Sequence, residues 1–93
     1  HESPSIKLIG ILQKKGARVS YHDPCVPQIR LPSGLQASIK LNYASLKLFD
    51  CTVIATPHSA YDYAKIARNS RLVFDARGVT QDITGKNIIR LGE

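Results

Sequence analysis

Residues 51–56 read CTVIAT, the most strand-like stretch of the 93-residue chain, and Pro57 ends it. Its apolar residues occur without regular alternation, which is typical of a central parallel strand covered by helices on both faces. Residues 72–75 (LVFD) have the same character, and residues 88–91 (IIRL) form a last short run. The sequence therefore predicts a mostly parallel sheet in which these three segments are strands.

A helix is predicted at the start of the chain, followed by a short strand. Ser3 is a favourable cap, and Pro4 fits the first helical position because its missing N–H has no helical partner there. Gly16 follows the last apolar residue of the helical pattern, where glycine readily adopts a left-handed conformation. Residues 18–22 (RVSYH) are β-prone and predict a strand.

The middle of the chain predicts one loop and two further helices. Residues 25–35 contain two prolines and a glycine, so we expect an irregular surface loop. A helix is predicted over residues 42–49 with Asn42 as its cap, although the residues just before it alternate like a strand. Another helix is predicted over residues 59–69, where an S-x-x-D capping pattern begins at Ser59.

The order of these elements predicts an α/β fold: a three-layer, Rossmann-like sandwich with a mostly parallel sheet. Such a fold normally opens with a strand, whereas this chain opens with a helix cap. We therefore expect the first strand of the sheet to lie outside this chain. Residues 1–93 are expected to form one domain, because the length suits one and neither a repeat nor a linker interrupts it.

Composition excludes several classes of protein. Hydrophobic residues make up 43% and charged residues 22%, as in ordinary globular domains, so disorder is not expected. Because no apolar run approaches the roughly 18 residues that span a bilayer, no membrane partner is expected. Residues 1–5 (HESPS) lack the basic and apolar blocks of a signal peptide, and there are only two cysteines. We therefore expect a cytoplasmic, reducing location.

The charge of the chain suggests an anionic partner. Thirteen Lys and Arg against seven Asp and Glu give a net charge of +6. Only Lys14 and Lys15 are adjacent, and neither zinc-finger spacing nor an aromatic RNA-binding signature occurs, so no nucleic-acid partner is expected. A small phosphate-bearing ligand, which needs only one or two well-placed cations, fits the scattered pattern better.

Several residues are candidates for chemistry, each with a structural alternative. His22, Asp23 and Cys25 are close in sequence like metal ligands, but a turn is the favoured interpretation, so no metal is predicted. Cys25 is expected to be an exposed thiol and Cys51 a small buried hydrophobe. His58 follows a predicted strand, at the edge where open α/β sheets bind ligands, although a structural turn role is favoured.

Arg77 also emerges just beyond a predicted strand, between the small residues Ala76 and Gly78. Small neighbours would let a phosphate or a sugar approach the guanidinium closely. From the residues alone, a solvated loop charge is an equally good interpretation. The chain has no G-x-G-x-x-G, P-loop or G-x-S-x-G motif, so neither a complete cofactor site nor a catalytic residue is predicted.

Three segments, in this order, resemble the C-terminal domain of the nucleotide-sugar dehydrogenases, which include the UDP-glucose and UDP-N-acetylglucosamine 6-dehydrogenases. They are residues 2–24 (ESPSIKLIGILQKKGARVSYHDP), 50–63 (DCTVIATPHSAYDY) and 72–79 (LVFDARGV). The resemblance implies a UDP-sugar-binding domain of a larger NAD-dependent enzyme that oxidises the sugar C6 alcohol to a carboxylate. The alternative is a free-standing α/β module for another phosphorylated ligand, such as a nucleotide or coenzyme A.

The resemblance also implies roles for individual residues. Arg77 falls on the family's D-x-R position, whose arginine binds the UDP-sugar. His1 stands where the family usually has an arginine that contacts NAD, so His1 is a cofactor-contact candidate that departs from the family's residue. Most of the NAD site and the catalytic cysteine belong to other parts of such an enzyme, which is expected to be a homodimer or a higher oligomer. Since neither Cys25 nor Cys51 matches that cysteine, the chain alone is expected to be inactive.

Overall fold

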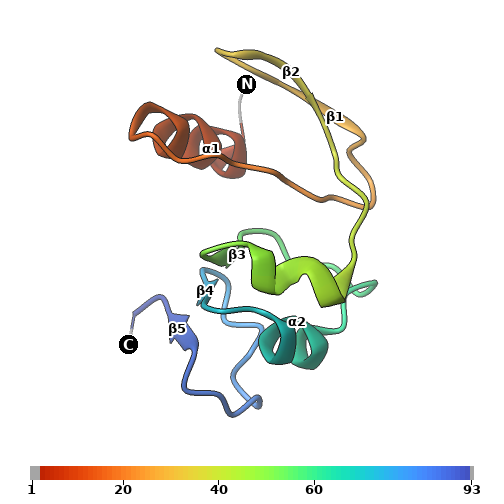
Figure 1. Cartoon of the computed structure of the whole chain (residues 1–93), viewed down its shortest axis with the longest axis vertical. Helices are drawn as coiled ribbons and strands as arrows, with labels where there is room; N and C mark the ends of the chain where they lie inside the picture. Colours follow the sequence, from red (N-terminus) through yellow and green to blue (C-terminus); the bar gives the residue numbers. More distant parts are fainter. Residues whose placement is uncertain (1–2, 93) are drawn as a thin grey trace. The chain divides into compact units, whose positions relative to one another are not determined.

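The computed structural model of the protein describes residues 3–92. The chain divides into two compact units, residues 1–41 and residues 42–93 (Figure 1). The first unit contains one helix and a two-stranded sheet, and the second contains the parallel sheet with its helices. The chain therefore has an α/β, Rossmann-like fold, as the order of segments in the sequence predicts.

The first unit opens with helix α1, Pro4–Lys14. The Ser3 hydroxyl caps it by accepting a hydrogen bond from the backbone N–H of Ile6 at 3.3 Å. Gly16 follows the helix with a φ of +95°, a conformation that side chains other than glycine rarely adopt. Both the start and the end of this helix are therefore confirmed.

The prediction of a loop over residues 25–35 is wrong, because most of this segment belongs to a hairpin. Strand β1, Gln28–Leu31, pairs antiparallel with strand β2, Gly34–Ala37. The two residues between the strands make the turn, and Gly34 allows it with a φ of +123°. Proline therefore marks the ends of these strands and not an irregular segment.

The strand predicted over residues 18–22 is also wrong. Residues 18–22 belong to no ladder, and separate hydrogen bonds hold them beside the hairpin. The Tyr21 carbonyl accepts from the Ile39 N–H at 2.8 Å, and the Val19 carbonyl accepts from the Gln36 side chain at 2.9 Å. High β-propensity alone does not make a strand, because a strand also needs a partner in register.

The second unit contains a three-stranded parallel sheet in the order β3–β4–β5. Its strands are β3, Thr52–Ile54, β4, Val73–Asp75, and β5, Ile88–Arg90. In register, Ile54 lies beside Asp75, and Asp75 lies beside Arg90. The three strands predicted from apolar runs are thus confirmed, with β4 at the centre.

Two helical segments accompany this sheet. The segment η1, Tyr43–Leu48, is a 3₁₀-helix capped by the Asn42 side chain, which accepts from the Ala44 N–H at 3.1 Å. Helix α2, Tyr63–Asn69, is capped by Asp62 and not by Ser59, so it begins later than predicted. The predicted cap at Asn42 is therefore confirmed, whereas the cap at Ser59 is wrong.

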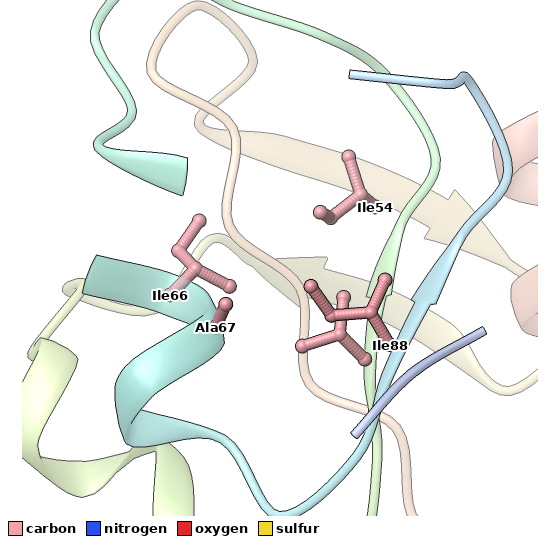
Figure 2. Close-up of a cluster of buried hydrophobic side chains, with 5 residues drawn as sticks. Ile54, Ile66, Ala67 and Ile88 are labelled. Carbon is pink, nitrogen blue, oxygen red and sulfur yellow. The ribbon is translucent and has the colours of Figure 1, made fainter. Parts of the chain in front are cut away.

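One face of the sheet carries the core of the second unit. Buried side chains from all three strands cluster with residues of α2, as Figure 2 shows. This cluster comprises Ile54, Ile66, Ala67, Val73 and Ile88. Val73, on the central strand, has no exposed surface.

The opposite face of the sheet carries a row of apolar residues. Val53, Phe74 and Ile89 are partners in register across the three strands. Val53 is 38% exposed and Ile89 is 50% exposed. The expectation that residues 51–56 are buried on both faces is therefore wrong at Val53.

Candidate functional site

The site is built where the parallel strands end. Because β3, β4 and β5 run in the same direction, the chain leaves all three at one edge of the sheet. Ligand sites in open α/β folds lie at this edge. His58 lies in the segment that follows β3, and Arg77 lies in the loop that follows β4.

Asp75, the last residue of β4, organises the loop after it. Its side chain has no exposed surface. Oδ1 accepts hydrogen bonds from the backbone N–H groups of Arg77, at 3.0 Å, and Gly78, at 2.8 Å. Oδ2 accepts from the backbone N–H of Thr80 at 2.9 Å and from its hydroxyl at 2.6 Å. Four donors within five residues of Asp75 therefore define the path of the loop.

These hydrogen bonds also determine the charge of Asp75. Burial alone would raise the pKa of the carboxyl group. Hydrogen bonds from the Thr80 side chain and from backbone N–H groups of the loop outweigh that effect and lower the pKa from 3.8 to about 2. The buried group is therefore a carboxylate at neutral pH, and the backbone of the loop surrounds this negative charge.

Arg77 extends from this loop as an exposed side chain. Its backbone N–H is held by Asp75, and its Nη1 lies 3.4 Å from the Ala55 carbonyl, just beyond β3. That hydrogen bond is long, and a guanidinium carries five N–H donors in a planar fork. Arg77 can therefore present donors to an anion at the carboxyl edge of β3 and β4.

Arg90 supports the same loop from β5. Its Nε donates to Thr80 Oγ1 at 3.1 Å, and its Nη2 donates to the carbonyls of Thr80, at 2.6 Å, and Ile83, at 2.7 Å. Sequence analysis missed both Thr80 and Arg90. The strand-end aspartate with a nearby glycine could have indicated a turn held by a side chain. The role of Arg90 becomes visible only through the register of β4 and β5.

Hydrogen bonds hold His58 in the turn that follows β3. Its Nδ1 accepts from the Ala60 N–H at 3.0 Å. The Tyr63 hydroxyl accepts from the His58 N–H at 2.8 Å and donates to the His58 carbonyl at 3.1 Å. This geometry is that of a structural turn residue, the interpretation that sequence analysis favours.

The side chain of Asp23 also stabilises a turn. Its Oδ1 accepts from the backbone N–H groups of Cys25, at 2.8 Å, and Val26, at 3.2 Å. Within residues 3–92, no group of three or more His, Cys, Asp or Glu side chains is arranged to hold a metal ion. His1, the cofactor-contact candidate, lies outside the described residues.

Both cysteines are free and exposed, which overturns the expectation that Cys51 is buried. Strand β3 begins only at Thr52, so Cys51 lies just outside the sheet. Nearby atoms still desolvate the thiol enough to raise its pKa, while a hydrogen bond from the Phe74 backbone acts in the opposite direction. Cys51 is therefore an accessible thiol whose proton is held more tightly than usual.

An open hollow in the second unit is separate from the loop of Arg77. It lies between α2 and the segment that precedes β5, and Arg77 does not line it. Its lining residues are Ala64, Ala67, Arg68, Ile83, Thr84 and Asn87. Asn87 uses its amide to donate to the carbonyls of Ala67 and Ser70, both at 2.9 Å, so it closes the end of α2.

The second unit is thus an α/β domain that presents an arginine at the carboxyl edge of a parallel sheet. The sequence model of the UDP-glucose/GDP-mannose dehydrogenase family, UDP binding domain, matches residues 1–82. The chain belongs to this family and is a UDP-binding domain of nucleotide-sugar dehydrogenases. No curated protein and no solved structure matched the chain. Among residues 3–92, no helix has the length and apolar character needed to cross a membrane.

Proposed function

We propose that this domain binds the UDP moiety of a UDP-sugar in an NAD-dependent 6-dehydrogenase. The enzyme would oxidise the C6 alcohol of UDP-glucose or UDP-N-acetylglucosamine to a carboxylate. Membership of the family supports the UDP part of this proposal. The observation that carries the site is Arg77, exposed at the carboxyl edge of the sheet on a loop held by the buried Asp75.

Arg77 binds and orients the ligand in this proposal. The Asp75 hydrogen bonds fix the backbone of Arg77 before the ligand arrives, so binding orders fewer groups. The planar guanidinium fork matches two oxygens of a diphosphate or two sugar hydroxyls, which a point charge cannot do. Gly78, next in the chain, has no side chain to obstruct the approach.

The start of α2 does not fit an NAD site of the dinucleotide-binding type. Such a site places the pyrophosphate at the N-terminus of a helix, after a glycine-rich turn. Here the segment before α2 contains Pro57 and no glycine. The Asp62 carboxylate already occupies the helix N-terminus, where it accepts from the Lys65 N–H at 3.0 Å. NAD, which accepts the hydride in such an oxidation, is assigned in this proposal mainly to another part of the enzyme.

The same proposal assigns the oxidation itself to other parts of the enzyme. Neither Cys25 nor Cys51 belongs to the loop that carries Arg77, and neither is given a catalytic role. We expect purified chain with UDP-sugar and NAD to form no NADH. In this proposal the whole enzyme is cytoplasmic and forms a homodimer or a higher oligomer.

The test compares two arginine variants of the full-length enzyme. Arg77→Ala should weaken UDP binding by roughly 1.5–3 kcal/mol, about one to two decades in Kd, because a hydrogen-bonded charge is lost. Arg77→Lys should recover only part of this loss. Arg71→Ala is the matched control, since Arg71 is exposed, pairs with Asp50 at 3.7 Å and precedes β4.

Calorimetric titration with UDP and, separately, with NAD provides the measurement. NAD affinity should remain unchanged in both alanine variants. If UDP affinity is unchanged in folded Arg77→Ala enzyme, Arg77 is a solvated loop charge and the site assignment is wrong. Tighter binding of another phosphorylated ligand, such as coenzyme A, would favour the alternative of a different α/β binding module.

A further inference from the structure

A continuous chain of side-chain hydrogen bonds connects the loop of Arg77 to the last strand. The Thr80 hydroxyl donates to Asp75 Oδ2 at 2.6 Å and accepts from Arg90 Nε at 3.1 Å. Asp75 and Thr80 have no exposed surface, and Arg90 is half-buried. The opposite carboxylate oxygen of Asp75 holds the Arg77 backbone. Arg90 and Arg77 are thus linked through two buried groups.

We propose that Thr80 and Arg90 are positioning residues for UDP binding, which hold Asp75, and through it Arg77, in the conformation that binds the ligand. This inference rests on the proposed function of Arg77. Thr80 and Arg90 act on the ligand only through the loop. Arg90 lies beyond the residues that the family match covers, so the match assigns it no role.

The geometry explains why the hydroxyl of Thr80 matters for Arg77. Asp75 divides its two oxygens: Oδ1 serves Arg77 and Gly78, and Oδ2 serves Thr80. Without the hydroxyl, Oδ2 retains the backbone N–H of Thr80, and the carboxylate can rotate more freely. Rotation of the carboxylate moves Oδ1 away from the Arg77 N–H. Loss of one donor at Thr80 therefore also weakens the hydrogen bonds at Arg77 and Gly78.

Arg90 holds Thr80 at two of its atoms. Its Nε meets the hydroxyl, and its Nη2 joins the carbonyls of Thr80 and Ile83. The Ile83 N–H also donates to the Thr80 carbonyl at 3.0 Å, so the guanidinium closes a turn that is already hydrogen-bonded. A lysine could not reproduce this fork, because a single ammonium group cannot match its planar arrangement of donors.

The effect on ligand binding follows from the population of the competent loop. When a loop adopts its binding conformation for only a fraction of the time, the measured Kd rises by the inverse of that fraction. Thr80→Val keeps the volume nearly constant and removes only the hydroxyl. We expect this variant of the full-length enzyme to raise the Kd for UDP roughly three- to tenfold, because the lost hydrogen bond to the Asp75 carboxylate acts on the ligand only through the loop.

A double-mutant cycle separates positioning from a general loss of stability. In an Arg77→Ala background, Thr80→Val should not change the UDP Kd further, because the residue through which it acts is gone. Thr80→Ser should restore wild-type affinity, since it returns the hydroxyl. The matched control is Thr84→Val, an exposed threonine on the same connection between β4 and β5, which should leave the Kd unchanged.

Each outcome of the cycle has a definite meaning. An unchanged Kd in Thr80→Val, or the same fold-change with and without Arg77, overturns the positioning role and leaves the function of Arg77 intact. An unchanged Kd in Arg77→Ala instead removes the proposed function, and the positioning role with it. Where Thr80→Val does not fold, Arg90→Lys enters the same cycle with the same expectations.

Discussion

The side chains of Asp75 and Thr80, both without exposed surface, share a hydrogen bond of 2.6 Å. A buried carboxylate is unfavourable unless donors surround it. Here the donors are a hydroxyl and three backbone N–H groups from the five residues that follow. The charge is therefore stabilised locally, by the loop that also carries Arg77.

Asp75 should make the stability of the second unit depend on pH in the acid range. Its pKa falls from 3.8 to about 2 on folding, so the folded state favours the charged form. The stabilisation, about 2 kcal/mol, is fully present above roughly pH 4 and is lost as pH falls through about 2. Urea unfolding of wild type and Asp75→Asn across pH 2–6 measures it, and equal pH dependence in both proteins would contradict it.

Asp62 and Ser59 both precede α2, but only Asp62 caps the helix. Asp62 accepts from the Lys65 N–H at 3.0 Å, whereas Ser59 lies four positions before Tyr63, the first residue of the helix. Asp62→Ala should lower the free energy of unfolding by about 1 kcal/mol, as loss of an N-cap does. Ser59→Ala should change it by less than about 0.5 kcal/mol. A larger loss for Ser59→Ala in urea unfolding would restore the cap predicted from sequence.

Two valines on adjacent strands give a matched pair for the core. Val73 has no exposed surface, while Val53 is 38% exposed. Val73→Ala should cost about 2 kcal/mol of stability, because it removes buried methyl groups and leaves a cavity. Val53→Ala should cost less than about 1 kcal/mol. Thermal or urea unfolding compares the two variants, and similar losses would show that both faces of the sheet are equally covered.

The two cysteines should both react with a thiol reagent in the folded protein, because both are exposed. For Cys51, the rate should still be rising at about pH 9, since desolvation raises the pKa of its thiol. Cys25→Ser and Cys51→Ser leave one thiol each, so rates can be followed separately from pH 6 to pH 10. Labelling of Cys51 only on unfolding would show that it is buried after all.

The strands of the second unit could be predicted because their signal is local. Burial of Ile54, Val73 and Ile88 produces short apolar runs that are readable in the sequence. The hairpin of the first unit could not be recognised in this way. Of the eight residues in β1 and β2, only Ile29 and Leu31 are buried, so alternation is visible over four residues at most.

The residues of the candidate site also differ in how well they could be predicted from the sequence. Arg77 could be placed at the edge of the sheet, because it follows a recognisable strand. Arg90 could not be connected to Arg77, since Arg90 and Asp75 are fifteen positions apart in the sequence and only the parallel register makes them neighbours. The exposure of Cys51 was missed because β3 begins one residue later than the apolar run.

Because Arg90 donates two hydrogen bonds to Thr80, we expect β5 and the loop that carries Arg77 to open as one cooperative unit. The Leu91 N–H donates to the Asp75 carbonyl at 3.0 Å, so β5 and the loop depend on the same residue of β4. Fraying of β5 would withdraw Arg90 from Thr80, and the loop would lose its support in the same event. In hydrogen exchange, the amide protons of Thr80 and Leu91 would then share one opening free energy, although eleven positions separate them in the sequence.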